Sequence, residues 1–302
     1  SLTGGTMKDK RRFHHRLLVL YASLLTGVLL FSVPGWSKEK VEWMEANAPP
    51  FFIHEGPLAG QGYEDVVTDI ITDALPKHDH QRVVANISRH YQDFKAGRKA
   101  CNVGFFKTPE REQFLYYSIP SFFTLPAVII INKSRFPEFG AAKTVSLEEI
   151  LRQEFVVGRA EKRSYGKDID HILNTFGNNT NIYAFEGSEL SLQLFQMLKH
   201  KRIDALISLP EEAVYQAERL GFKDQIMTLT IAENQNGYDG WLSYVACSKN
   251  EWGKQFIEQI NQVLLKQRPT EKYRQAYERW LDESSLEGYR KLYHEVFLKA
   301  VD

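Results

Sequence analysis

The stretch ACNVGFFKTPER, residues 100–111, bears on both the fold and the function of this chain. Its first part, residues 100–106, is mostly apolar and predicts a strand. That strand runs into Thr108-Pro109-Glu110-Arg111, and an aromatic-Ser-x-Pro segment, Tyr117-Ser118-Ile119-Pro120, follows. An arginine guanidinium holds a carboxylate through two parallel N–H bonds, a geometry that lysine cannot reproduce. Arg111 is therefore the first candidate ligand-binding residue.

Residues 108–111, the corner that follows the predicted strand, also fit a purely structural role. Threonine is a favoured N-cap residue, proline is favoured at the first helical position, and glutamate suits the first turn. Thr108 would then begin a short surface helix, and Arg111 would lie in solvent. These residues alone leave both interpretations open.

The N-terminal segment predicts export. A basic stretch between Lys8 and Arg16 precedes an apolar run at residues 17–33, and Gly35 and Ser37 are the small residues expected before a cleavage site. We predict a secretory signal removed after Ser37, which places the protein in the periplasm. The alternative is an uncleaved membrane anchor, because the run is near the lower limit of about 18 residues for a spanning helix.

Composition narrows the class of protein. Removing 37 of the 302 residues leaves 265, enough for one large domain or two medium ones. Lys+Arg and Asp+Glu both number 38, so net charge gives no attraction towards nucleic acid. No Gly-rich phosphate loop, Cys/His metal spacing or nucleophile elbow is present. We expect a globular, monomeric protein that is not an enzyme and carries no cofactor or metal.

Strand-like and helix-like segments alternate along the chain, which is typical of open α/β sheets. A first alternation covers residues 41–131 and a second covers residues 146–220. Residues 241–248 predict a returning strand, followed by three helices. We predict two lobes joined by a hinge around a cleft. Lobe 1 is discontinuous and consists of residues 38–131 and 235–302. Lobe 2 spans residues 132–234. Residues 1–37 precede both lobes.

Five short segments together resemble the bacterial extracellular solute-binding proteins of family 3. They are Ala48-Pro49-Pro50-Phe51, Gly62-Tyr63-Glu64-Asp65, Lys95-Ala96-Gly97-Arg98, the Thr108–Arg111 corner and Lys201-Arg202-Ile203-Asp204-Ala205. The resemblance implies the type II periplasmic-binding fold over nearly all of the mature chain. It also implies amino acid binding or capture of another small polar solute, and an ABC-type permease in the membrane as partner.

The resemblance also implies positions for the ligand site. In this fold the ligand lies between the lobes, at carboxyl ends of strands and N-termini of helices, where free N–H groups favour anions. Arg111 and Thr108 would grip a carboxylate, aromatic residues would form walls, and a helix start in lobe 2 would close on the ligand. The further candidates are Phe51, Phe52, Tyr91, Phe106, Arg163, Ser164 and Tyr165.

Two departures from the family pattern bear on the ligand. Small hydroxyl or glycine residues are usual before Thr-x-x-Arg, whereas here Gly104 is followed by Phe105, Phe106 and Lys107. An acid usually follows the Asp-Ala strand and holds the ligand ammonium, whereas here Ser208-Leu209-Pro210 precedes Glu211 and Glu212. An unpaired buried ammonium would be costly. A carboxylate or another anion is therefore better supported than an α-amino acid.

The resemblance further predicts that two cysteines lie close together, with their bonding left open, and it leaves two other functions open. In the resembling fold the strand that holds Cys247 lies beside the strand that holds Cys101, so the two cysteines are expected within bonding distance. A module of the same fold could instead pass ligand occupancy to a membrane signalling partner. A periplasmic lyase or dehydratase built on this scaffold is the third alternative.

Overall fold

The computed structural model describes residues 37–161, 163–186, 192–234 and 237–301. All of the predicted signal segment except its last residue, Ser37, lies outside the described residues. Lys40–Asp302 forms one compact unit. Among the helices of the described ranges, none is both long enough and apolar enough to cross a bilayer.

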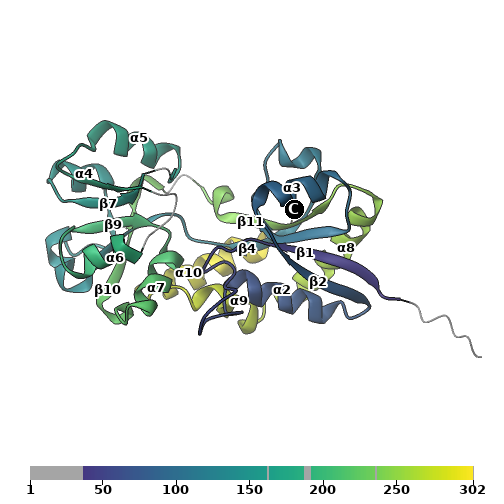
Figure 1. Cartoon of the computed structure of the whole chain (residues 1–302). Helices are drawn as coiled ribbons and strands as arrows, with labels where there is room; N and C mark the ends of the chain where they lie inside the picture. Colours follow the sequence, from purple (N-terminus) through teal and green to yellow (C-terminus); the bar gives the residue numbers. More distant parts are fainter. Residues whose placement is uncertain (1–36, 162, 187–191, 235–236, 302) are drawn as a thin grey trace, which may run out of the picture. The chain divides into compact units, whose positions relative to one another are not determined.

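The first sheet has five strands in the order β2-β1-β3-β11-β4. Strand β3 pairs in parallel with β1 and antiparallel with β11, which also pairs antiparallel with β4. Figure 1 shows α3 and α8 beside these strands, with α2 near β1 and β2. The strands are β1 (Glu39–Glu45), β2 (His78–Val84), β3 (Ala100–Phe105), β4 (Leu115–Phe123) and β11 (Leu242–Ser248), and the helices are α2 (Tyr63–Ala74), α3 (Ile87–Lys95), α8 (Glu251–Gln267), α9 (Glu271–Glu278) and α10 (Glu283–Glu295).

The second sheet has six strands in the order β6-β10-β5-β9-β7-β8. The parallel pairs β7–β8 and β7–β9 arise from strand–helix–strand units, and β5 runs antiparallel to β9 and β10. Figure 1 shows α4, α5 and α6 gathered around β7 and β9. The strands are β5 (Val128–Asn132), β6 (Thr144–Val145), β7 (Val157–Ala160), β8 (Ile182–Phe185), β9 (Ala205–Ser208) and β10 (Ile226–Ile231), and the helices are α4 (Leu147–Arg152), α5 (Lys167–Phe176), α6 (Leu192–Lys199) and α7 (Pro210–Arg219).

Short 3₁₀ turns connect several of these elements. They are Arg111–Gln113, Lys133–Phe139, Lys223–Gln225, Ala232–Asn234, Asp239–Trp241 and Phe297–Lys299. The first of them belongs to the corner that follows β3.

The chain leaves the first sheet after β4 and returns to it as β11, so the segment that forms the second sheet is inserted between two parts of the first. This is the two-lobed α/β architecture that the sequence predicts, and the predicted fold class is confirmed. The predicted lobe boundary after residue 131 falls inside β5, whose main chain bonds within the six-stranded sheet. The change of sheet therefore comes earlier, between β4 and β5.

A disulfide joins the two segments of the first sheet. Cys101 on β3 and Cys247 on β11 are register partners, their Cα atoms are 4.1 Å apart, and their sulfurs are bonded. Both cysteines are completely buried. The predicted proximity of the pair is confirmed.

Strand β2 begins with polar residues. His78-Asp79-His80 is the start of the strand, and α3 begins at Ile87. Trp43 Nε1 donates to His80 Nδ1 over 3.0 Å, and the His78 ring packs edge-on against Phe256. Neighbouring strand and helix side chains thus satisfy polar residues that look turn-like in isolation.

Candidate ligand-binding site

The Arg111 side chain is held in place on two sides of its guanidinium. Its Nε donates to the Tyr91 hydroxyl over 2.7 Å, and its Nη1 donates to the Phe106 carbonyl over 2.9 Å. The guanidinium carbon also lies 5.7 Å from the centre of the Tyr91 ring and 5.1 Å from that of Phe105. A guanidinium has five N–H donors, so these two bonds leave three, including a pair at the end of the group. That end can still grip an anion bidentately.

The backbone of the corner is fixed by Thr108. Its hydroxyl accepts from the Arg111 amide over 3.3 Å, and its carbonyl accepts from the Glu112 amide over 2.9 Å. Thr108 thus makes a cap-like hydrogen bond, although the 3₁₀ turn begins only at Arg111, with Glu110 in the cap position. Arg111 is half-buried, because Tyr91 from α3 approaches it from the side. Local capping and a positioned guanidinium coexist in this corner.

Phe106 and Lys107 continue from β3 beside Arg111. The Phe106 carbonyl also accepts from the Tyr117 hydroxyl over 3.4 Å, while its ring is 47% exposed. Lys107 Nζ lies 6.0 Å from the Tyr117 ring centre and 5.7 Å from that of Tyr244. Burial raises the pKa of Tyr117 to about 12 despite the opposing charge of Arg111. Tyr117 thus stays a neutral donor at physiological pH.

The two phenylalanines predicted as a wall have different environments. Phe52 is 2% exposed and belongs to the large hydrophobic core, which includes residues of both lobes. Phe51 is half-buried, and its ring centre lies 5.1 Å from that of Tyr63. Of the pair, Phe51 is the one accessible to a ligand.

The predicted residues of the second lobe are bonded within that lobe. Arg163 Nη1 contacts both carboxylate oxygens of Glu212, over 2.8 and 2.7 Å, and Ser208 donates to the same carboxylate over 2.6 Å. Ser164 donates to Asp170. Tyr165 is 8% exposed.

The Tyr165 hydroxyl accepts from the Ala160 amide, and its amide donates to Asp170. The structure therefore places Arg111, Thr108, Tyr91 and Phe106 together. It gives Arg163, Ser164 and Tyr165 partners of their own.

Sequence reasoning missed a buried link between the two sheets. Glu211, in the first turn of α7, accepts from the Tyr277 hydroxyl of α9 over 2.9 Å. The Tyr277 hydroxyl in turn accepts from the amide of Leu125, between β4 and β5. Burial and the neighbouring Glu212 raise the pKa of Glu211 to about 8. Two consecutive acids after a buried strand were the available signal, but the partner of Glu211 lies 66 residues away in the chain.

Glu64 is a second buried acid, in the first turn of α2. It is 5% exposed, and its carboxyl lies against Gly104 near the end of β3, in space that a larger residue there would fill. Burial, with Asp65 and Glu45 nearby, raises the pKa of Glu64 well above its usual range. Burial therefore favours the protonated form of this carboxyl.

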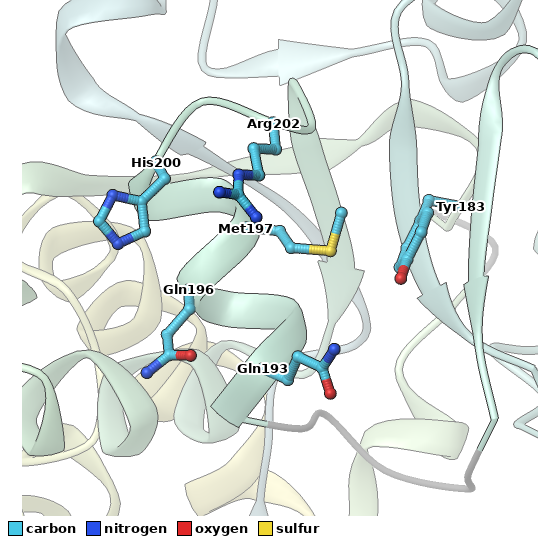
Figure 2. Close-up of a pocket in the computed structure, with 6 residues that line it drawn as sticks. All are labelled: Tyr183, Gln193, Gln196, Met197, His200 and Arg202. Carbon is cyan, nitrogen blue, oxygen red and sulfur yellow. The ribbon is translucent and has the colours of Figure 1, made fainter.

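A cavity of about 630 Å³ lies elsewhere, in the second lobe. Figure 2 shows Gln193, Gln196 and Met197 projecting from α6, with Tyr183 opposite them on β8. His200 and Arg202 complete the labelled lining. Since none of the predicted site residues lines it, this cavity is separate from the Arg111 corner. Within the described residues, no group of three or more His, Cys, Asp or Glu side chains is arranged to hold a metal ion.

Comparisons with known proteins find structures of similar fold but no match by sequence. No family model matches the chain, and no curated protein matches it. An ancestral cationic amino acid solute-binding protein matches with a TM-score of 0.60 and 18% identity, covering 81% of this chain and 95% of that one.

Two further structures have the same architecture. A polar amino acid ABC uptake transporter substrate-binding protein from Streptococcus thermophilus matches with a TM-score of 0.58 and 18% identity, over 84% of this chain and 91% of that one. An ancestral cyclohexadienyl dehydratase matches with a TM-score of 0.50 and 19% identity, over 80% and 92%. At such identities the likeness establishes a shared fold, which here covers almost all of each matched protein.

Proposed function

We propose that this chain is a periplasmic solute-binding protein that captures a small carboxylate-bearing solute and delivers it to an ABC-type importer. The protein acts as a monomer, and its partners are the solute and a membrane permease. The shared fold with substrate-binding proteins of ABC transporters supports the class of function. The single observation that carries the ligand chemistry is the guanidinium of Arg111, fixed by Tyr91 and Phe106 with its outer donors still available.

A ligand carboxylate at this corner would bind a guanidinium group whose position is already fixed. Two hydrogen bonds and two aromatic rings already restrain the arginine, so little side-chain freedom remains to be lost on binding. Arg111→Lys keeps a positive charge but loses the planar fork. Truncating one partner of a desolvated charge pair typically costs about 2–5 kcal/mol, so Arg111→Ala is expected to weaken binding by tens to thousands of fold.

The experiment is a thermal-shift screen of the exported protein against carboxylates, amino acids and inorganic anions, followed by calorimetry on each hit. Ligands that bind the folded state raise the melting temperature. Arg89→Ala is the matched control, because Arg89 lies on the same helix as Tyr91 and its exposed side chain pairs only with Asp93 in the described contacts. Unchanged affinity in both variants would assign Arg111 a structural role alone.

An enzyme on this scaffold is the second candidate. Glu211, with a pKa of about 8, has the proton affinity of a general acid, and the fold is shared with an ancestral dehydratase. However, Glu211 is 1% exposed and its carboxyl is engaged by Tyr277. A buried acid bonded to a neighbouring tyrosine suits a link between elements better than proton transfer to a solute, so capture remains the proposal.

A further inference from the structure

Another cavity, of about 610 Å³, adjoins the two segments along which the chain passes between its sheets. The first segment connects β4 to β5 and contributes Leu125 and Pro126, and the second connects β10 to β11 and contributes Tyr238 and Trp241. Its volume is in the usual range for small-molecule sites, roughly 300–1,000 Å³. None of the residues predicted for the solute site lines it, so this cavity is separate from the Arg111 corner.

The aromatic wall of this cavity is held in place by the first sheet. The centre of the Trp241 ring lies 5.0 Å from that of Tyr238, edge to face, and 5.6 Å from that of Phe123 at the end of β4. The Trp241 carbonyl accepts from the Thr124 amide over 2.9 Å, which ties the two connecting segments together. Within the described part of the chain, neither the Trp241 indole N–H nor the Tyr238 hydroxyl has a hydrogen-bond partner. The wall therefore offers two fixed rings and two available polar groups.

Helix α10 also lines the cavity, and Gly288 lies at the middle of its lining face. The other α10 residues of the lining lie one, three and four positions before and after this glycine, and they are Ser284, Ser285, Glu287, Tyr289, Lys291 and Leu292. Residues three and four positions apart share one face of a helix. The lining face is therefore centred on Gly288.

Nothing in the helix itself requires a glycine at position 288. Glycine inside a helix is destabilising relative to alanine. Gly288 is not among the glycines with a positive φ, and a Cβ there would meet no atom within 4 Å. A larger side chain at the centre of the lining face would enter the cavity, so the glycine keeps this space open.

The charged side chains of the lining carry a surplus of one positive charge. They are Lys143, Glu287 and Lys291, and the described contacts include no ion pair for any of them. Of the other described acids on the same segments, Glu233 and Glu283 do not line the cavity. Two lysines without partners against one glutamate favour a negatively charged occupant.

A further acid, Asp282, lies just before α10 and is 6% exposed. Its carboxylate accepts from three hydroxyl groups that line the cavity, those of Thr228, Ser284 and Ser285. These three donors are therefore directed at Asp282. The donors that remain for an anion are those of the lysines and of the aromatic wall.

We propose that this cavity is a second ligand site, which takes a small aromatic acid. The ring of the acid lies against Trp241 and Tyr238, and its negative group lies beside Lys143 and Lys291. This inference does not depend on the proposed function, because it uses no residue of the Arg111 corner. An occupant would contact both of the segments that connect the sheets.

Three probes that share one ring system and differ in charge test the ligand class. Indole-3-acetate is an anion, indole is uncharged and tryptamine is a cation. Calorimetry with the purified exported protein is expected to show indole-3-acetate binding at least about tenfold more tightly than indole, and tryptamine binding most weakly. Tighter binding of indole or of tryptamine than of indole-3-acetate would overturn the aromatic acid.

Gly288→Leu tests the location of the site. Its affinity for indole-3-acetate is expected to fall about tenfold or more, because the side chain occupies the cavity. Its melting temperature is not expected to fall, since the change removes a helix glycine and meets open space. Gly288→Ala is the matched control, because one methyl group leaves most of the volume free. Equal affinity in Gly288→Leu and the parent would overturn the site.

A pair of charge changes one turn apart on α10 tests the sign of the ligand charge. Lys291→Met is expected to weaken indole-3-acetate binding, whereas Glu287→Gln is expected to strengthen it, because each lines the cavity with an opposite charge. Weaker binding in both variants, or the reverse order, would contradict an anion beside these residues.

The outcomes also separate this site from the Arg111 corner, which is itself proposed to bind a carboxylate. Loss of indole-3-acetate binding in Arg111→Ala, with unchanged binding in Gly288→Leu, would assign the acid to the corner. That result overturns the second site and supports the proposed function. Failure of all three probes to bind overturns the second site alone, because the solute of the Arg111 corner is tested separately.

Discussion

Arg111 and Arg163 stand at corresponding places in the two lobes and are held in contrasting ways. Each follows a strand of its own sheet and was expected to face a ligand. Arg111 bonds a neutral hydroxyl and a carbonyl, which fix its position without neutralising its charge. Arg163 bonds a carboxylate that is itself buried, so its charge is matched within the protein. An arginine is available to a ligand when its supporting partners are neutral.

The contrast extends to how each arginine contributes to stability. Glu212 would be left as an uncompensated buried charge without Arg163, whereas the partners of Arg111 would be left as neutral groups near water. The same substitution in the two places should therefore give different results, and three measurements can break or sharpen this comparison.

The largest effect is expected for Arg163→Ala. Removing one partner of a buried ion pair typically destabilises a protein by about 3–5 kcal/mol, because the other charge stays buried and unpaired. Urea unfolding followed by circular dichroism measures this loss. The double variant Arg163→Ala/Glu212→Gln should recover part of it, since the orphaned charge is gone. A loss below about 1 kcal/mol in the single variant would place Arg163 among the available arginines.

A pH-dependent effect, smaller over any one pH unit, is expected for Glu211→Gln. The folded carboxyl keeps its proton up to a pKa of about 8, while the unfolded one releases it near the ordinary glutamate pKa of 4.5. As pH rises between these values the unfolded state binds fewer protons, so the free energy of unfolding falls, by at most about 1.4 kcal/mol per pH unit. Glu211→Gln removes this loss, so its stability relative to the parent should increase with pH.

The measurement is urea unfolding at mildly acidic, neutral and mildly alkaline pH. Glu218→Gln is the control, because the hydrogen bond from Arg279 lowers the pKa of Glu218 and its contribution is lost only as pH falls below the ordinary carboxyl range. A parent protein whose stability rises across the neutral range, with no change in Glu211→Gln, would contradict the assignment.

The smallest effect on stability is expected for Arg111→Ala. Two hydrogen bonds at a half-exposed site are lost, but water can replace the donor at both acceptors, so the cost should be about 1 kcal/mol. The same urea experiment gives the value. If Arg111→Ala destabilised the protein as much as Arg163→Ala, both arginines would be structural and the distinction between them would fail.

The corner around Arg111 could be predicted because most of it is contiguous in sequence. Phe106, Thr108 and Arg111 lie within six residues, and capping rules alone place the Thr108 hydroxyl on the Arg111 amide. The alternation of strands and helices likewise predicted two sheets with an inserted second lobe.

What could not be predicted depends on contacts between distant residues. Arg163 and Glu212 are 49 positions apart, and nothing near either residue identifies the other as its partner. Adjacent phenylalanines gave no indication that Phe52 would enter the core while Phe51 stayed half-buried. The start of β2 looks like a polar turn in the sequence because Trp43 and Phe256, which contact its histidines, come from other elements.

The bond between Cys101 and Cys247 has a consequence for the integrity of the whole molecule. The cysteines are 146 positions apart, and all of the second sheet lies between them. The chain from Cys101 to Cys247 is therefore a covalent ring that includes the second lobe and is closed by the disulfide in the first sheet. A protease that cuts the chain once within that lobe would release no fragment until a reductant opened the ring, so a nicked molecule would keep both lobes.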